Sequence, residues 1–100
     1  MALPEPKGHR IPLEEAVAQA KRFREGLHKG GLFLRQEIDE LLAQPRCSAL
    51  RFYYGRTADG ADTLILVGSD DKGKDMADGI VLETHFPCPP FCNDESPLNS

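Results

Sequence analysis

The sequence predicts an α+β domain in which two N-terminal helices pack on a three-stranded antiparallel sheet, followed by an extended Cys-Pro-rich C-terminal tail. Three observations predict this fold: helical apolar periodicity in the first half, strand-like apolar runs after it, and prolines crowded near the end. One hundred residues fit one domain, and 40% hydrophobic residues are ordinary for a globular protein. We expect a flexible arm at 1–11, one domain at 12–86 and a tail at 87–100.

The first helix is predicted over residues 12–25. Pro12 suits the first turn of a helix, where its missing N–H costs nothing. The apolar residues that follow keep a helical spacing at Leu13, Val17, Ala20 and Phe23. Acidic residues at the beginning and basic residues at the end favour the same element through the helix dipole.

The second helix is predicted over residues 35–44, with Ile38, Leu41 and Leu42 on one side. Pro45 ends it, because the residue before a proline avoids helical angles. A helix of about ten residues is marginal alone, so we expect it to dock on the sheet. The preceding apolar run, residues 32–34, is too short to assign to a helix or a strand.

The three strands are predicted at 49–55, 62–68 and 80–86, in a meander. Asp59-Gly60 marks a reversal between the first two, which makes them a hairpin. The prolines after residue 86 lack the backbone N–H that donates hydrogen bonds to a neighbouring strand, so we do not expect a central strand there.

The hairpin predicts one face for the helices and a second face that needs another cover. Leu50, Phe52 and Tyr54 point to one side of the first strand, and alternation turns its other residues to the opposite side. The second strand carries apolar residues on both faces, which is unusual for a hairpin that exposes one face to solvent. We expect the tail or another molecule to cover the second face. The predicted interaction surface consists of Arg51, Tyr53, Ile65, Val67 and Phe91.

Composition and motifs argue against several classes of function. A net charge of −4 does not favour a nucleic-acid binder, and no apolar run approaches a membrane span. The first residues lack the apolar centre of a secretory signal, which favours the cytoplasm. No nucleophile elbow or His-Glu-x-x-His helix is present, so we do not expect an enzyme.

The cysteines form the strongest local pattern, His85-x2-Cys88-x3-Cys92, with Cys47 far upstream. Three thiolates and one imidazole would complete a tetrahedral zinc site, although paired Cys-x2-Cys knuckles are absent. A Cys88–Cys92 disulfide is the second reading, since prolines could hold the two sulfurs together, but a reducing cytoplasm disfavours it. Free thiols in a rigid tail are the third.

The assembled pieces resemble a group of small bacterial proteins, mainly from the Bacteroidota, with no established activity. The matching motifs are Phe23-Arg24, Leu-Leu-Ala-Gln-Pro-x-Cys at 41–47, Leu-x-Phe-Tyr-Tyr-Gly at 50–55, and the Cys-Pro-Pro-x-Cys tail that ends Ser-Pro-Leu-Asn at 88–99. The resemblance implies a bacterial cytoplasmic setting and supplies no catalytic or binding residues.

Two functions remain open from the sequence. The first is a non-enzymatic protein-interaction module, homodimeric or bound to another protein, that uses the second sheet face and the tail. The alternative is a thiol-redox or structural-metal protein that acts through Cys88, Cys92 and Cys47 with His85.

Overall fold

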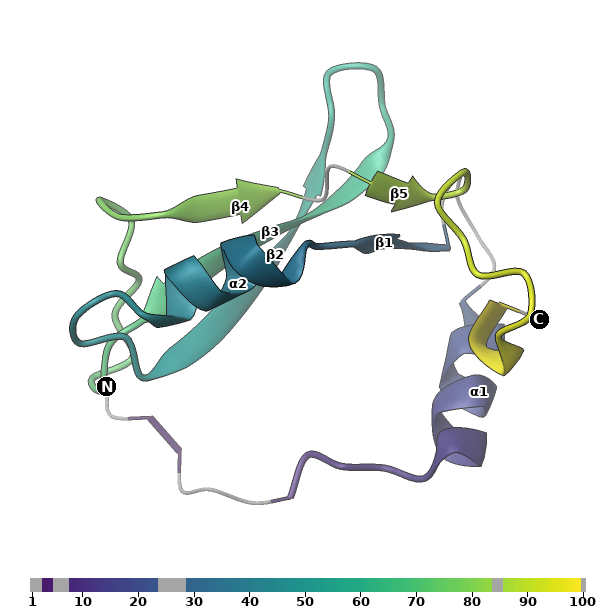
Figure 1. Ribbon diagram of the computed structural model, residues 1–100, viewed down its shortest axis with the longest axis horizontal. Coiled ribbons are helices and arrows are strands. Elements are labelled where there is room, and N and C mark those ends of the chain that lie inside the picture. The colour runs from purple at the N-terminus through teal and green to yellow at the C-terminus, as the bar shows by residue number, and fades with distance from the viewer. Residues whose placement is uncertain (1–2, 5–7, 24–28, 84–85, 100) are drawn as a thin grey trace.

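The computed structural model describes residues 3–4, 8–23, 29–83 and 86–99 (Figure 1). Its helices are α1 (Leu13–Arg22), α2 (Arg35–Leu42) and a 3₁₀ helix, η1 (Pro97–Asn99). Its strands are β1 (Gly30–Leu32), β2 (Ala49–Arg56), β3 (Asp62–Ser69), β4 (Val81–Glu83) and β5 (Phe86–Cys88). The predicted α+β class, with two α-helices and a three-stranded antiparallel sheet, is confirmed. Among the described segments, no helix has the length and apolar character needed to cross a membrane.

The three-stranded sheet has the order β2-β3-β4, and both pairings are antiparallel. The predicted hairpin joins β2 to β3, with Tyr53 opposite Ile65 at its middle. Its loop closes through the Thr57 N–H, which donates to the Ala61 carbonyl at 2.8 Å. Gly60 has φ +91°, a left-handed conformation that glycine adopts without steric cost. The turn therefore lies where Asp-Gly predicted it.

Helix α2 lies over one face of this sheet and contacts β3 (Figure 1). Leu41 is fully buried beneath the helix. The Gln44 side chain accepts a hydrogen bond at 2.8 Å from the Ile80 N–H, which fixes the end of the helix to the start of β4. A Cβ atom at Gly68 would lie 3.4 Å from Gln44 Nε2, so the helix end and β3 approach closely here.

A second, two-stranded sheet was not predicted. It pairs β1 with β5 in antiparallel fashion, with Gly30 opposite Cys88. The predicted strand at 80–86 is therefore divided between two sheets, and residues 84–85 between its parts lie outside the described residues. Pro87 is tolerated within β5 because both strands of a two-stranded sheet are edges.

The predicted packing of the first helix on the three-stranded sheet is not confirmed. Instead α1 contacts η1, and Figure 1 shows the two side by side, away from α2. The pairing of β1 with β5 is the physical reason, because it returns the tail to the segment that follows α1. The Lys29 ammonium completes this arrangement by donating to Asn99 Oδ1 at 2.8 Å. The tail is thus folded back rather than extended throughout. Helix α1 ends at Arg22 and Phe23 has an extended backbone, so the prediction that the helix continues through Phe23 is wrong.

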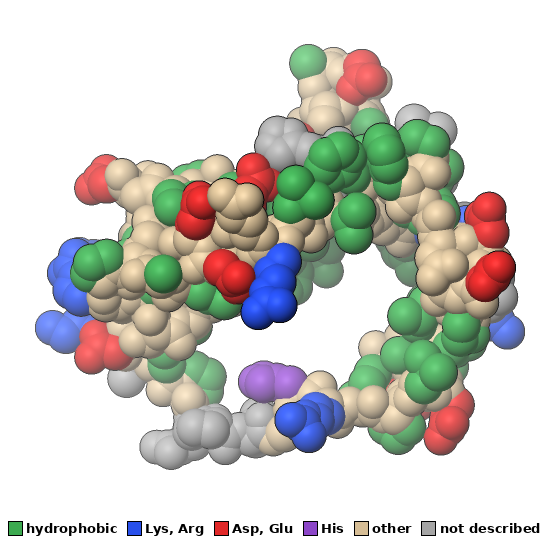
Figure 2. All heavy atoms as spheres, viewed as in Figure 1, with side chains coloured by type: hydrophobic (Ala, Val, Ile, Leu, Met, Phe, Trp, Pro, Cys, Tyr) green, Lys and Arg blue, Asp and Glu red, His purple; other side chains and the backbone are tan. Residues whose placement is uncertain are grey.

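The separation of α1 from the three-stranded sheet gives the molecule an open shape. The radius of gyration is 15.1 Å, whereas a compact domain of this length has about 13 Å. Figure 2 shows an opening between the segment that carries His9 and the body formed by α2 and its sheet. Apolar side chains consequently remain accessible on the sheet.

Candidate interaction surface

Strand β2 is an edge strand that pairs only with β3 among the described residues. It is eight residues long, against about five or six for an average strand. It contains no proline and no lysine, the residues that natural edge strands use to prevent further pairing. A long edge without proline or lysine is suited to accept another strand.

The amide groups of β2 alternate between β3 and the open edge. Thr57 and Ala61 form a hydrogen-bonded pair, and hydrogen-bonded pairs recur at every second position of an antiparallel ladder. In the register of this hairpin, Tyr53 and Ile65 are therefore hydrogen-bonded to each other. It follows that the N–H and C=O groups of Phe52, together with those of Leu50 and Tyr54, point to the open edge.

The side chains of these edge residues lie on the sheet face that carries α2, yet they are accessible. Phe52 is opposite Leu66 in the register, but Phe52 is 53% exposed and Leu66 is 6% exposed. The difference arises because α2 contacts β3 and α1 does not add a second layer over β2. Tyr54 is 84% exposed, although its ring meets that of Phe52 edge-to-face with centroids 5.5 Å apart.

On the opposite face, a polar cluster joins β2 to the loop after β3. Tyr53 Oη donates a hydrogen bond to Asp75 Oδ2, and Arg51 Nη1 donates to Asp75 Oδ1. Arg51 also donates to the Gly73 carbonyl at 2.9 Å. The hydrogen bonds from Tyr53 and Arg51 hold the pKa of Asp75 below its ordinary value, and the same bond to Asp75 raises the pKa of Tyr53. The cluster is thus a charge-paired latch that holds the loop.

The predicted interaction surface is only partly accessible. Val67 is 4% exposed, because it lies between Arg51 and Val81 in the sheet, so it offers no surface to a partner. Phe91 is exposed, but it packs on Phe86 with centroids 5.0 Å apart, in the turn after β5. The sequence-predicted residues are therefore not gathered in one patch.

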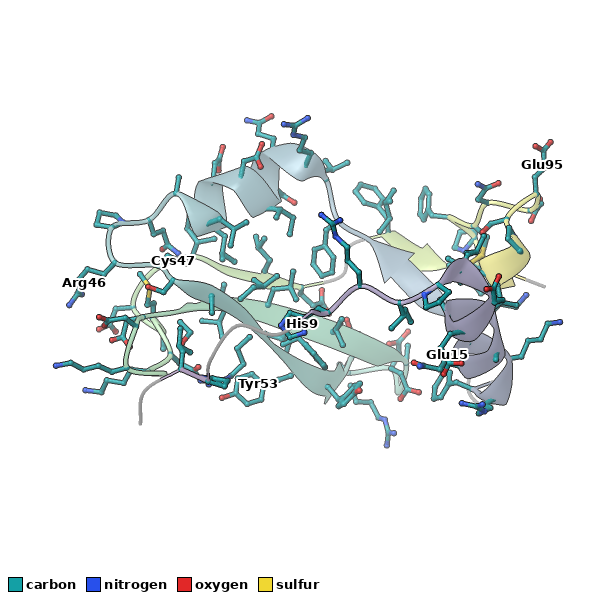
Figure 3. All side chains as sticks on the ribbon, turned by 90° about the horizontal axis from the view of Figure 1, so that it is seen from below. His9, Glu15, Arg46, Cys47, Tyr53 and Glu95 are labelled. Atoms are coloured by element: carbon teal, nitrogen blue, oxygen red, sulfur yellow. A yellow bond between two sulfur atoms is a disulfide. The ribbon has the colours of Figure 1, made fainter. Side chains whose placement is uncertain are left out.

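The structure joins Cys88 to Cys92 by a disulfide, with their Cα atoms 4.8 Å apart. Cys47 is a free thiol, and its Sγ donates to the Ala49 carbonyl at 3.4 Å. Figure 3 shows Cys47 and Glu95, three residues after Cys92, at opposite ends of the view. The disulfide in the tail and the free thiol beside β2 are therefore two separate features.

A zinc site that uses all three cysteines is not assembled in this structure. Within the described segments, no group of three or more His, Cys, Asp or Glu side chains is arranged to hold a metal ion. His85 lies outside the described residues. The predicted zinc set therefore stays a prediction from the sequence.

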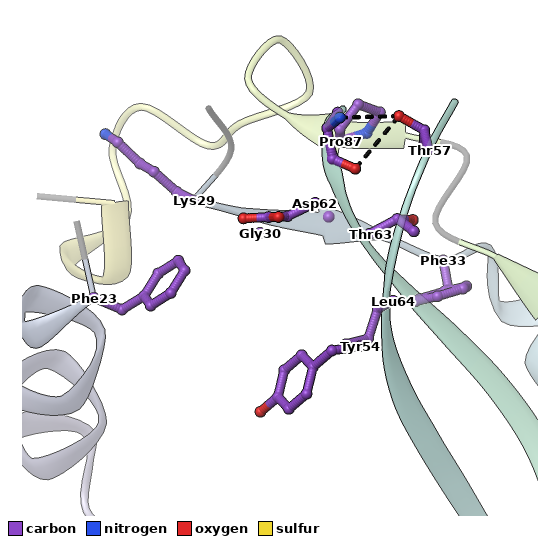
Figure 4. Close-up of a pocket in the computed structure, with 12 residues that line it drawn as sticks. Phe23, Lys29, Gly30, Phe33, Tyr54, Thr57, Asp62, Thr63, Leu64 and Pro87 are labelled. Atoms are coloured by element: carbon purple, nitrogen blue, oxygen red, sulfur yellow. Dashed lines mark hydrogen bonds between the residues drawn. The ribbon is translucent and has the colours of Figure 1, made fainter. Parts of the chain in front are cut away.

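A cavity of about 260 Å³ lies between the far end of the hairpin and β1 (Figure 4). Its walls are mainly apolar and include Phe23, Phe33, Tyr54, Leu64 and Pro87.

Two charged residues also line this cavity, and both are engaged. Lys29 donates to Asn99, and Asp62 accepts from Arg56 at 3.2 Å. The described lining therefore presents apolar contact surface rather than an acid, base or nucleophile aimed at a reacting group.

Sequence reasoning missed that β2 is accessible from its helix-bearing face. Alternation assigned Leu50, Phe52 and Tyr54 to that face correctly. These side chains were expected to be covered by the first helix, which does not pack there. The length and composition of the strand were the available signal, since residues 49–56 contain neither proline nor lysine. Comparison of this chain with protein-family models, with curated proteins and with solved structures gave no match.

Proposed function

We propose that this chain is a non-enzymatic protein-interaction module that binds an extended polypeptide along the open edge of β2. One observation carries the proposal: β2 presents outward-directed amide groups beside exposed Leu50, Phe52 and Tyr54. Strand addition of this kind obtains affinity from main-chain hydrogen bonds and specificity from alternate side chains. Aromatic side chains are also enriched at the centres of protein interfaces. The bacterial cytoplasmic setting expected from the sequence belongs to the same proposal.

Peptide selection tests the edge directly. Random peptides about as long as β2 are displayed against the immobilised chain, and the affinities of the selected peptides are then measured with two variants. Phe52→Pro removes the N–H directed to the open edge, a substitution that an edge strand tolerates. Phe52→Ala removes the ring as well but keeps that N–H. We expect the proline variant to bind about tenfold more weakly than the alanine variant.

The outcome also separates edge pairing from ordinary surface contact. Selected peptides should carry apolar or aromatic residues at alternate positions that face Phe52 and Tyr54, because alternate side chains of an added strand face the same side. Equal binding by the two Phe52 variants would show that no backbone hydrogen bond forms at this position, which contradicts strand addition. Circular dichroism of both variants checks that the sheet is retained.

The Cys88–Cys92 disulfide favours a second candidate function, reversible thiol–disulfide exchange by the tail. In this role a dithiol reductant transfers two electrons and two protons to the disulfide. The product is two tail thiols, and the reductant leaves as a disulfide. Measurement of the Cys88–Cys92 redox potential against glutathione buffers tests it. A potential far below that of the cytoplasmic glutathione pool would make the bond structural rather than reactive.

A further inference from the structure

We propose that the polypeptide bound along β2 is β2 of a second copy, so that two three-stranded sheets join into one continuous sheet across a two-fold axis. This inference rests on the proposed function and names its partner. Closed two-fold dimers are the commonest homo-oligomers, and their interfaces must be self-complementary. A two-fold dimer through β2 therefore requires that β2 complement itself in hydrogen bonding, side chains and charge.

Hydrogen bonding is self-complementary in the antiparallel orientation. Leu50, Phe52 and Tyr54 each direct one N–H and one C=O to the open edge. An identical antiparallel strand presents the same groups at the same spacing. A two-fold axis perpendicular to the sheet also keeps each face on its own side, so the apolar faces of the two copies remain continuous.

The side chains of β2 favour a partner strand that carries apolar or aromatic side chains on both faces. Phe52 and Tyr54 are exposed on the helix-bearing face, and Tyr53 is 48% exposed on the other. A partner strand with one polar face would leave one of these surfaces against polar groups. A second copy of β2 supplies aromatic rings on both faces, and aromatic cross-strand pairs stabilise antiparallel sheets.

Charge permits the approach of a second copy because the charges of β2 are already paired. Its only charged residues are Arg51 and Arg56, which form ion pairs with Asp75 and Asp62. The edge is therefore close to neutral, although the chain has a net charge of −4. A strongly acidic or basic peptide would gain little from such an edge, whereas an identical edge with little net charge meets little net repulsion.

The separation between the two copies of Arg51 also distinguishes between the possible registers of the two β2 strands. With Tyr53 on the two-fold axis, Arg51 lies opposite Gly55 of the partner subunit. The two copies of Arg51 are then four residues apart along the strands, about 14 Å, beyond the Debye length of about 8–10 Å. With Phe52 on the axis instead, they would be diagonal neighbours at about 7–8 Å. We therefore place Tyr53 on the axis, where Phe52 lies opposite Tyr54 of the partner subunit.

Cysteine cross-linking tests both the dimer and its register. In a Cys47→Ser background, the variants Tyr53→Cys, Phe52→Cys and Tyr54→Cys are each oxidised by dissolved oxygen, which accepts the electrons and protons that the two thiols lose. Tyr53 faces its own copy in a non-hydrogen-bonded pair, with Cα atoms about 4.5 Å apart, within disulfide range. The other two positions meet their copies diagonally at about 7–8 Å, too far for a bridge.

We expect a covalent dimer from Tyr53→Cys alone. Preferential cross-linking of Phe52→Cys would overturn the Tyr53-centred register, and equal cross-linking of all three would overturn a specific interface. Because Tyr53→Cys also removes the hydrogen bond to Asp75, sedimentation of the unmodified chain provides a second measurement. It should show a concentration-dependent dimer, and Tyr54→Lys, which places a charge on the exposed edge, should weaken it about tenfold or more.

The two proposals fail in different ways. A chain that stays monomeric at high concentration but still binds selected peptides along β2 overturns the second copy as the partner and leaves the interaction module intact. A monomeric chain that binds no peptide overturns both. A dimer that survives Tyr54→Lys unchanged places the interface elsewhere and overturns the present inference.

Discussion

The Tyr53 hydroxyl donates a hydrogen bond to the Asp75 carboxylate, and this contact joins the middle of β2 to the loop that follows β3. Arg51 donates to the same carboxylate, so a single acidic side chain holds two residues of the edge strand. The isolated bridge between Ser69 and Asp75 brings the loop into position for both contacts. The latch thereby orders the strand on which both proposals depend.

Asp75→Asn is predicted to lower the melting temperature, and the effect should depend on pH. The folded state lowers the pKa of Asp75, so its stabilisation is fully present above the ordinary carboxyl pKa of about 4 and is lost as pH falls through the lowered value. The folded state raises the pKa of Tyr53, so that contribution is present below about pH 10 and is lost at higher pH, as pH rises through the raised value. The difference in melting temperature between the two proteins should therefore be constant from about pH 5 to 9 and shrink at both extremes.

Asp78→Asn is the matched control for this experiment. Asp78 is an exposed carboxylate a few residues further along the same connection, so its substitution should change the melting temperature little at any pH. If both variants lose the same stability with the same pH profile, general charge effects would explain the result and the latch would not.

Leu41→Ala is predicted to destabilise the chain by about 2–5 kcal/mol, because it opens a cavity beneath α2. Leu41 is completely buried, whereas its neighbour Leu42 is 44% exposed. Leu42→Ala should therefore cost much less, and urea unfolding of the two variants measures the difference. Equal losses would mean that α2 does not dock on the sheet through Leu41.

Gly68→Ala is predicted to destabilise the chain by about 1–3 kcal/mol through overpacking. The added Cβ would lie 3.0 Å from Cys47 Sγ and 3.4 Å from Gln44 Nε2, between β3 and the end of α2. Gly30→Ala is the control, since its Cβ would meet no described atom within 4 Å. Chemical unfolding should rank the two variants clearly, and a neutral Gly68→Ala would contradict the close approach of helix and sheet.

Local signals predicted the parts of the fold that depend on neighbouring residues. The Asp59-Gly60 reversal and the alternation of apolar residues were sufficient for the hairpin and its faces, because a short loop and a period of two fix register nearby. The stripe of Ile38, Leu41 and Leu42 was likewise sufficient for α2. Both elements lie in continuous stretches of sequence.

The position of α1 could not be predicted from local signals, because it depends on a distant pairing. Gly31 meets Pro87 across the two-stranded sheet, and neither residue is typical of a strand. That pairing carries η1 to α1 and leaves β2 without the expected second helix layer. The candidate surface depends on the same packing: Val67, on the face predicted to need a cover, is buried, while Tyr54, on the helix-bearing face, is exposed.

Thiol titration is predicted to give one reactive group per unfolded chain before reduction and three after it. The sequence contains three cysteines, and the structure leaves Cys47 free while Cys88 and Cys92 are bonded to each other. The titration must be made in denaturant so that accessibility does not limit the reaction. A Cys47→Ser variant provides the control and should give no reactive thiol before reduction. Three thiols in freshly prepared wild-type chain would contradict the disulfide, and a melting temperature that then falls on addition of chelator would favour the zinc site.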